Sequence, residues 1–232
     1  MTQEARRPGR AAMTLALILL AALFVALGLW QVQRRAWKHR LIAAVDARIH
    51  ASPVPAPGPA TWPRLSASGD AYRRVVVTGH FLPHRQTLVR AVSDRGAGYW
   101  VLAPLDTGPF TVLVNRGFIP PERKGQTPEP AGSVRVTGLL RMTEPGGGFL
   151  RSNDPARGNW YSRDVAAIAA HGGLRHVAPY FIDADAGLNA AGMPEGGLTV
   201  IRFSDNHGVY ALTWFGMATL CLWSVWRLRS AA

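Results

Sequence analysis

The sequence predicts an α+β membrane protein in which two transmembrane helices flank an outer antiparallel β-sheet or barrel-like domain with one short helix. Two apolar runs predict the helices. Residues 11–29 contain Thr14 as their only conventionally polar side chain, and residues 209–226 contain no charge. At about 1.5 Å per residue, each run can cross most of a ~30 Å hydrocarbon core. Between the runs, apolar residues recur with period two and turn residues separate them, as in short antiparallel strands.

The first apolar run is predicted to be a retained membrane anchor. Arginines precede it, as they also precede the apolar run of a cleaved signal peptide. The run is longer than a usual signal segment, however, and no clear A-x-A-like cleavage site ends it. Trp30 follows at the expected headgroup depth, with the cations Arg34 and Arg35 beyond it. We therefore expect a cytoplasmic N-terminus over residues 1–10 and a transmembrane helix over residues 11–30.

The flanks of the second apolar run predict the orientation of the chain. Arg227 and Arg229 follow the run closely, whereas Arg202 is the only cation shortly before it. Because Lys and Arg are enriched on the cytoplasmic side of membrane helices, the C-terminus is predicted to be cytoplasmic. Two spans return the chain to its starting side, so the segment between them is translocated. This assigns residues 208–226 to the second helix and residues 227–232 to the cytoplasm.

Residues 31–59 are predicted to form a stalk and a spacer. Helical spacing of apolar and basic residues continues from Trp30 to His50. The alternating prolines of residues 53–59 then favour a stiff, extended connection.

Residues 60–207 are predicted to form the translocated β-rich domain. Gly- and Pro-rich breaks separate its short strands. The expected strands cover residues 75–81, 87–90, 99–103, 110–115, 134–140, 179–182 and 198–203. One short helix is expected over residues 164–170, with Ser162 or Asp164 as its cap and Gly172 and Gly173 at its end.

Composition and motifs argue against several classes of function. The 26 Lys and Arg exceed the 14 Asp and Glu and give a net charge of +12. No zinc finger, RNA-binding signature or basic helix with interleaved aromatics accompanies this charge, so anionic lipid and anionic cofactors are expected as partners, and nucleic acid is not. Cys221 is the only cysteine, which excludes an intramolecular disulfide. The sequence has no GxSxG, P-loop, HExxH or GxGxxG motif, and we expect no enzymatic activity.

Two polar pairs in the β-rich segment are weak candidates for chemistry. His80 and His84 have an HxxxH spacing, but Pro83 between them disfavours the helix on which that spacing would converge on a metal. Asp183 and Asp185 resemble paired acid/base carboxylates, yet no histidine accompanies them and a glycine follows. We interpret the histidines as solvent-facing strand and turn residues, and the aspartates as turn formers.

Asn115, Arg116 and Gly117 end an apolar strand and precede two prolines. The asparagine is predicted to close an Asx-turn with Gly117 at positive φ. Arg116 has either a structural role at this sheet edge or the role of holding a carboxylate or propionate, and we favour the structural role.

His207 stands just before the second apolar run and has three interpretations. It can be an interfacial histidine preceded by the capping residues Asp205 and Asn206, a pH-sensitive group, or an axial ligand of haem iron. Tyr210 and Trp214 follow three and seven residues later, so the three side chains are expected on one helical face. Such a face suits a porphyrin and equally an ordinary helix-helix interface. Residue types alone favour the interface.

Three stretches together carry a resemblance to a known family. The exit of the first span, residues 27–42, begins Leu-Gly-Leu-Trp-Gln; residues 112–120 are Val-Leu-Val-Asn-Arg-Gly-Phe-Ile-Pro; and Asn206-His207 precede Tyr-Ala-Leu-Thr-Trp. In this order and with two spans, the chain resembles the surfeit locus protein 1 family of cytochrome c oxidase assembly factors over about residues 13–226. It departs from the family pattern at Phe118, where Trp is usual, and at Gly208, where a larger apolar residue is common.

The resemblance implies a bacterial inner-membrane protein, with a periplasmic domain, that helps oxidase subunit I to mature by receiving or handing over haem a. It implies subunit I, haem a synthase and the lipid bilayer as partners. The candidate iron ligand is His207, and the other expected haem-site residues are Tyr210, Trp214, Trp30, Gln31, Arg34 and Arg35, with one of the two arginines near a propionate. The alternatives are a cofactor-free scaffold that stabilises a subunit I assembly intermediate and, less favoured, a membrane-tethered hydrolase.

Overall fold

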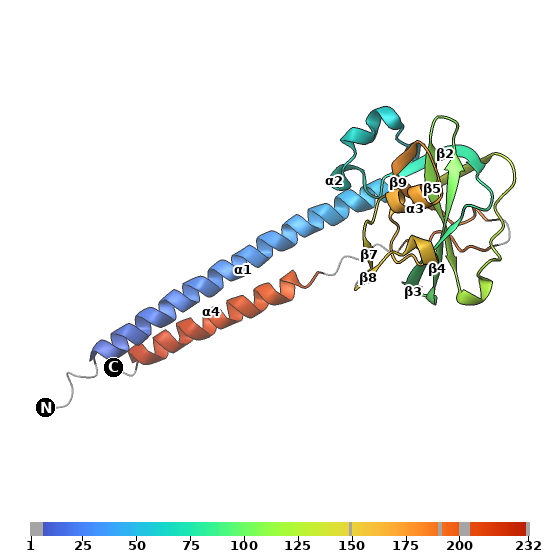
Figure 1. Ribbon diagram of the computed structural model, residues 1–232. Helices are drawn as coiled ribbons and strands as arrows, with labels where there is room; N and C mark the ends of the chain where they lie inside the picture. Colours follow the sequence, from blue (N-terminus) through green and yellow to red (C-terminus); the bar gives the residue numbers. More distant parts are fainter. Residues whose placement is uncertain (1–6, 149, 190–191, 200–204, 231–232) are drawn as a thin grey trace. The chain divides into compact units, whose positions relative to one another are not determined.

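The computed structural model describes residues 7–148, 150–189, 192–199 and 205–230 of the chain. Contacts between residues divide it into two compact units (Figure 1). One unit is a helix pair, made by the chain up to Ala44 and from Arg202 onward. The other is a β domain, Val45–Ile201.

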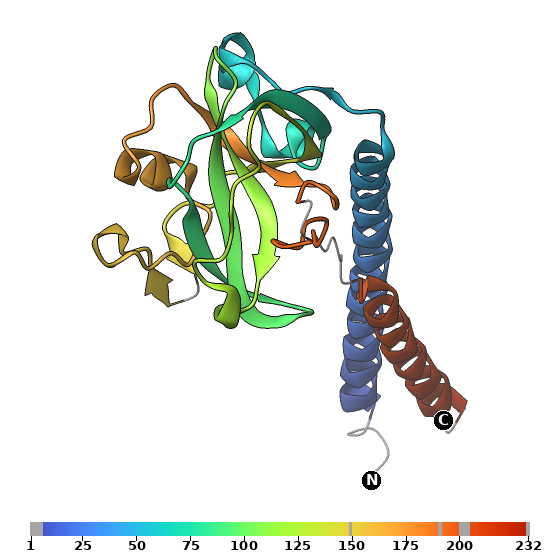
Figure 2. The same ribbon diagram turned by 90° about the vertical axis from the view of Figure 1, so that its right-hand side faces the viewer.

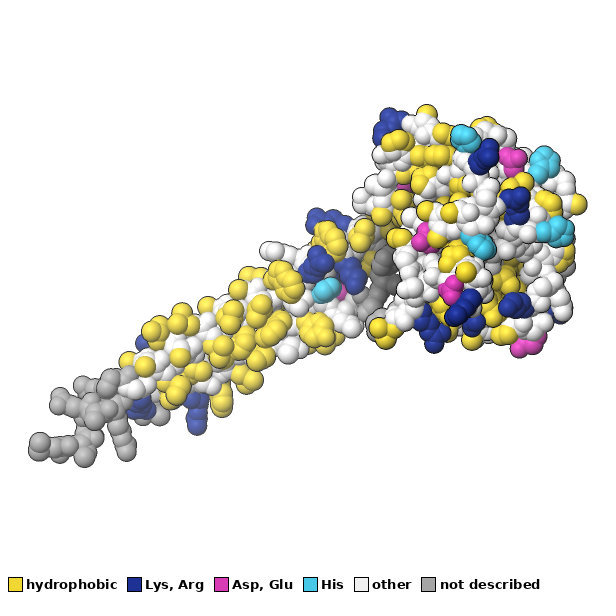
Figure 3. Space-filling model, in the orientation of Figure 1, with side chains coloured by type: hydrophobic (Ala, Val, Ile, Leu, Met, Phe, Trp, Pro, Cys, Tyr) yellow, Lys and Arg dark blue, Asp and Glu magenta, His cyan; other side chains and the backbone are white. Residues whose placement is uncertain are grey.

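The helix pair consists of the long N-terminal helix and the C-terminal helix. Helix α1 (Arg7–His50) is continuous over 44 residues, which confirms the prediction that the first span continues as a helix to His50. Helix α4 (His207–Ser230) begins one residue before the predicted start at 208 and extends four residues beyond the predicted end at 226. Both helices are long and apolar enough to cross a membrane. Hydrophobic side chains cover the visible face of the pair (Figure 3), and these features indicate a membrane protein.

Small side chains let the two helices approach closely. Ala21 and Phe24 of α1 form a buried cluster with Ala218 and Cys221 of α4. Gly28 lies so close to α4 that an added Cβ would be 2.5 Å from Cε1 of Phe215. Small residues at the interface are typical of packed membrane helices, where close van der Waals contact replaces the hydrophobic effect.

The β domain is built on a seven-stranded mixed sheet. In spatial order its strands are β1 (Val54–Pro55), β2 (Arg74–Phe81), β6 (Val134–Met142), β9 (Val177–Ala184), β5 (Thr111–Ile119), β4 (Gly96–Asp106) and β3 (Thr87–Ser93). A further pairing of β2 with β4 closes five of these strands into a barrel, and β1 and β3 extend from it. The barrel-like domain is thus confirmed. The sheet is antiparallel except where β1 pairs with β2 and where β5 pairs with β9, which are both parallel.

Short elements complete the domain. They are η2 (Pro59–Arg64), α2 (Ala67–Asp70), η3 (Pro121–Arg123), the small β7 (Gly147–Gly148) and β8 (Arg151–Ser152) ladder, η4 (Pro155–Arg157) and α3 (Val165–His171). Asp164 accepts a hydrogen bond from the backbone N–H of Ala167, so it is the cap of α3, and Gly172 follows the helix as predicted. In the last turn of α1, Arg48 donates to the carbonyls of Ser68 and Ala71, which joins this turn to the β domain.

The barrel strands alternate between two hydrophobic clusters because successive side chains point to opposite faces. Val114, Ile182 and their counterparts on all five strands fill the barrel interior. Leu113 and Phe181 point outward and pack with Val165 and Ile168 of α3, which lies beside the sheet (Figures 1 and 2).

Strand β5 does not end at Asn115 as predicted, and this correction has a physical cause. The register with β4 shifts so that Arg116 and Gly117 form a bulge, after which the strand continues to Ile119. The predicted Asx-turn is confirmed within this bulge, since the N–H of Gly117 donates to Oδ1 of Asn115 at 3.2 Å and Gly117 has φ 132°. A Cβ at Gly117 would come 2.3 Å from the backbone of Glu195, so only glycine fits.

Two further sequence-based predictions need correction or fall outside the described residues. Asp183 is not a turn former: it lies in β9, is buried, and accepts from Arg141 and Arg163. Asp185 does follow the end of β9, before a turn, and pairs with Arg74. The predicted strand over residues 198–203 is not formed at 198 and 199, and the rest of it lies outside the described residues.

Candidate functional site

The candidate site is centred on His207, the first residue of α4. Its Nδ1 lies 2.8 Å from Oε1 of Gln31 on α1. A carbonyl oxygen only accepts, so with this orientation of the amide Nδ1 carries the hydrogen and donates it. The lone pair then resides on Nε2, which has no hydrogen-bond partner among the described residues. The ring is thereby fixed in position with one nitrogen available as a ligand.

Asp205 connects the start of α4 to α1. Its Oδ1 accepts from the backbone N–H of His207 at 3.1 Å and so caps the helix, as one interpretation of the sequence expected. Its Oδ2 accepts from Nε2 of His39 at 2.7 Å and lies 3.5 Å from Nε of Arg35. One carboxylate therefore contacts two side chains of α1 and the first turn of α4.

The contacts of Asp205 stabilise its charged form. The hydrogen bond from His39 holds the pKa of the Asp205 carboxyl below its usual range, and the N–H of His207 and the charge of Arg35 act in the same direction. A carboxyl whose pKa falls on folding contributes stability above its ordinary pKa of about 3.9, and that contribution is lost as the pH falls through the lowered value. The connection is therefore fully formed at neutral pH.

Three side chains of α1 that meet the start of α4 are spaced four residues apart. Gln31, Arg35 and His39 lie on one face of the helix, as this spacing requires. Gly208 makes room for one of them, because an added Cβ there would be 3.3 Å from Nη1 of Arg35. The departure from the family pattern at Gly208 thus coincides with a place where α1 approaches α4.

The remaining predicted haem-site residues are only partly brought together. Trp214 stacks on Phe24 of α1, with ring centroids 5.6 Å apart, and therefore belongs to the helix-helix interface. Tyr210 is 53% exposed and Trp30 is 54% exposed, so both present aromatic surface to the outside of the pair. Arg34 lies over the ring of Trp37 at 4.1 Å.

Sequence reasoning missed His39 as part of this site and treated Asp205 only as a helix cap. The contact between them joins residues 166 positions apart, which no local pattern reveals. The four-residue spacing from Gln31 to His39 is the one signal that could have indicated it. Among the described residues, no group of three or more His, Cys, Asp or Glu could hold a metal ion.

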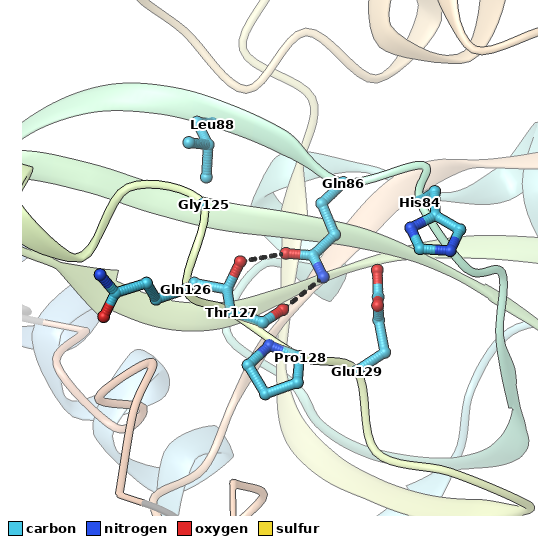
Figure 4. A pocket seen from close by; sticks show the side chains of 8 residues that line it. All are labelled: His84, Gln86, Leu88, Gly125, Gln126, Thr127, Pro128 and Glu129. Atoms are coloured by element: carbon cyan, nitrogen blue, oxygen red, sulfur yellow. Dashed lines mark hydrogen bonds between the residues drawn. The ribbon is translucent and has the colours of Figure 1, made fainter.

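The β domain contains a separate hollow, lined by residues of the segments 84–88 and 125–129 (Figure 4). Its volume is about 520 Å³, and Gln86 forms one wall by exchanging hydrogen bonds with Thr127 at 2.7 and 2.8 Å. Arg116 donates to the backbone carbonyls of two residues that line the hollow, Thr127 and Pro128, and to Oδ1 of Asn189. No carboxylate forms an ion pair with Arg116 within the described part of the chain. These contacts support the structural role of Arg116.

Comparisons with known proteins give a consistent result. The model of the SURF1 family matches residues 18–219. Surfeit locus protein 1 of Mus musculus is 38% identical over 234 aligned residues, which cover 89% of this chain and 73% of the mouse protein. The protein of that name from Homo sapiens is 35% identical, covering 89% and 75%. A SURF1-like protein of Monosiga brevicollis is 34% identical, covering 90% and 85%. The chain belongs to the SURF1 family.

Proposed function

We propose that this protein assists the maturation of cytochrome c oxidase subunit I by holding haem a on His207 and handing it on. Members of the SURF1 family are cytochrome oxidase assembly factors, and family membership supports the general role. The role is that of a carrier and assembly factor, and it requires no catalytic residue.

The hydrogen bond between His207 and Gln31 is the observation that carries the haem proposal. Histidines that bind metal ordinarily donate their second ring N–H to a carbonyl or carboxylate, which fixes the tautomer and the orientation of the ring. Gln31 supplies such an acceptor at 2.8 Å and leaves Nε2 free. Haem a would supply an iron that accepts an imidazole nitrogen and two propionates that require cations. Gln31 is therefore a positioning residue for the proposed ligand.

The neighbouring side chains fit the rest of an amphipathic porphyrin. Trp30 precedes Gln31 and Tyr210 lies one turn after His207, and both offer exposed aromatic surface. Arg34 has no ion pair among the described residues, whereas Arg35 already contacts Asp205. We therefore assign Arg34 to a propionate and Arg35 to the connection between the helices.

For location we propose the bacterial inner membrane, with both termini in the cytoplasm and the β domain in the periplasm. Arg227 and Arg229 in the last turn of α4 support this orientation. On this side of the membrane His207 would meet subunit I, and haem a synthase would be the source of the haem.

The visible spectrum of the protein, purified from a host that makes haem a, tests the proposal. We expect a haem a spectrum in the wild type and its loss in His207→Ala. Gln31→Leu removes the acceptor and is expected to reduce haem occupancy severalfold, whereas Gln31→Glu retains an acceptor and should restore it. His84→Ala, in an exposed turn of the β domain, is the matched control and should leave the spectrum unchanged.

Two results would contradict the proposal. One is a protein without haem that still copurifies with subunit I, which would identify a cofactor-free scaffold. The other is a haem spectrum that His207→Ala leaves intact.

A further inference from the structure

Five side chains of the β domain form a continuous row in which cations alternate with aromatic rings. The guanidinium of Arg90 lies 5.8 Å from the ring of Tyr161 and 6.0 Å from that of Tyr99. Arg151 continues the row on one side, 5.5 Å from Tyr161, and Lys124 continues it on the other, 5.6 Å from Tyr99. We call these five residues the cation–aromatic row.

The fold brings the row together from four parts of the chain. Arg90 and Tyr99 are directly paired in the antiparallel ladder of β3 and β4, so their side chains share one face of this hairpin. Arg151 belongs to β8, Tyr161 follows η4, and Lys124 follows η3. Aromatic faces attract cations, and this attraction fixes the orientation of the three charged side chains.

Two hollows adjoin the row. One, of about 250 Å³, is lined by Arg90, Tyr99 and Lys124 together with Trp160 and His171. The other, of about 340 Å³, is lined by Arg90, Tyr99, Tyr161 and Arg151 together with apolar Val92 and Pro121. Neither hollow is lined by a carboxylate.

The cations of the row are not paired with a carboxylate in the part of the chain that the structure describes. Within the described residues, Arg90, Lys124 and Arg151 form no ion pair, whereas Arg95 at the tip of the same hairpin pairs with Glu195. Three neighbouring positive charges without a counter-charge attract anions to the surface between them. The surface is therefore complementary to a ligand with several negative charges.

We propose that the cation–aromatic row binds an acidic, extended segment of a partner protein. Neighbouring members of the row are 5.5–6.0 Å apart, close to the ~6.6 Å between alternate side chains on one face of an extended chain. Val92 is 86% exposed beside the row and offers contact to an apolar side chain between two acidic ones. Because successive side chains of an extended chain point to opposite faces, a segment with acidic and apolar residues at alternate same-face positions, as in Glu-x-Val-x-Glu, places both kinds against the row. A phosphate group would use the cations alone. The proposal does not depend on haem binding by His207.

Fluorescence anisotropy of a labelled eight-residue peptide, Glu-Ser-Val-Ser-Glu-Ser-Val-Ser, which carries Glu and Val alternately on one face when extended, tests the proposal, with the full-length protein in nanodiscs of neutral lipid. We expect saturable binding that weakens as salt rises and that a Lys/Val peptide of equal length does not reproduce. The triple substitution Arg90→Gln, Lys124→Gln and Arg151→Gln should weaken binding at least about tenfold.

Matched variants separate the row from the overall charge of the protein. Arg64→Gln, Arg135→Gln and Arg175→Gln together remove the same charge from exposed positions that line neither hollow and should change affinity by less than about twofold. At the exposed position beside the row, Val92→Glu should weaken binding and Val92→Lys should strengthen it. Equal losses in the two triple variants, absence of peptide binding, or binding of phosphatidylglycerol vesicles without peptide binding would overturn the proposal.

Discussion

Replacement of Arg116 tests whether this buried arginine supports the fold of the β domain. Arg116 is 1% exposed, and its Nη2 donates to the carbonyl of Pro128 at 2.7 Å and to Oδ1 of Asn189 at 2.8 Å. Asn189 in turn donates to the carbonyls of Arg116 and Pro194. Burial lowers the pKa of the guanidinium because it disfavours the charged form. The hydrogen bonds of Arg116 must therefore offset the free energy that burying this charge costs. The arginine thereby joins β5 to two loops that have no regular ladder of their own.

Arg116→Ala is expected to lower the free energy of unfolding of the domain by about 2–4 kcal/mol. Hydrogen bonds from a charged donor contribute about 1.5–3 kcal/mol, and the acceptors left behind are shielded from water, while relief of the buried charge offsets part of the loss. For a domain of this size, such a change lowers the melting temperature by roughly 4–16 °C. Arg116→Lys should recover little of this, because an ammonium group cannot reproduce the fork of the guanidinium.

Thermal unfolding of the full-length protein in detergent, followed by circular dichroism, measures this effect. Arg135→Ala, which removes an exposed arginine from β6, is the control and should stay within about 0.5 kcal/mol of the wild type. An Arg116→Ala protein that melts together with the control would show that the buried contacts contribute nothing, and the structural role of Arg116 would have to be abandoned.

Three further predictions test other parts of the structure. Gly28→Ala places a methyl group against Phe215 and should destabilise the helix pair by about 1–3 kcal/mol, measured by thermal unfolding. The double variant Gly28→Ala, Phe215→Leu should recover part of this stability. Asp205→Ala should increase amide exchange in the first turn of α4 severalfold, measured by mass spectrometry, while Asp205→Asn should keep much of the protection because its side-chain oxygen still caps the helix. Tyr180 is buried, its hydroxyl donates to the backbone carbonyl of Pro57, and burial raises its pKa, so the unfolded chain loses the phenol proton first above about pH 10. The free energy of unfolding should then fall with pH more steeply in the wild type than in Tyr180→Phe, by up to ~1.4 kcal/mol per pH unit. Equal slopes in denaturant titrations of the two proteins would contradict this prediction.

The local pattern of apolar residues predicted most of the secondary structure, because helices and strands each bury a face with their own residue period. The apolar runs located both helices, and the period-two segments located six of the barrel-forming and edge strands. The bulge in β5 was not predictable in the same way. Gly117 and the two prolines look like the end of a strand in sequence, and only the shifted register against β4 allows the strand to continue.

Long-range pairing explains where the sequence-based predictions of polar residues were wrong. Asp183 looked like a turn residue because Asp185 and a glycine follow it. In the fold it accepts from Arg141 and Arg163, which are 42 and 20 positions away, and from Asn115 at 2.8 Å. These partners offset the free-energy cost of burying a carboxylate in β9. They lie far from Asp183 along the chain, so no local sequence pattern predicts them.

The helix pair itself explains why the candidate site lies where it does. Along α1 the contacts with α4 are apolar as far as Gly28, and the next contact on the same face, at Gln31, is polar. On α4 the change occurs between Ala211, which is buried, and His207. The contacts between the two helices therefore change from apolar packing to hydrogen bonds at the same level on both helices. The free Nε2 of His207 lies at that level. The proposed haem a, with an apolar ring and charged propionates, would be held at this boundary, and the pattern of residues that pairs the helices also sets the position of the imidazole.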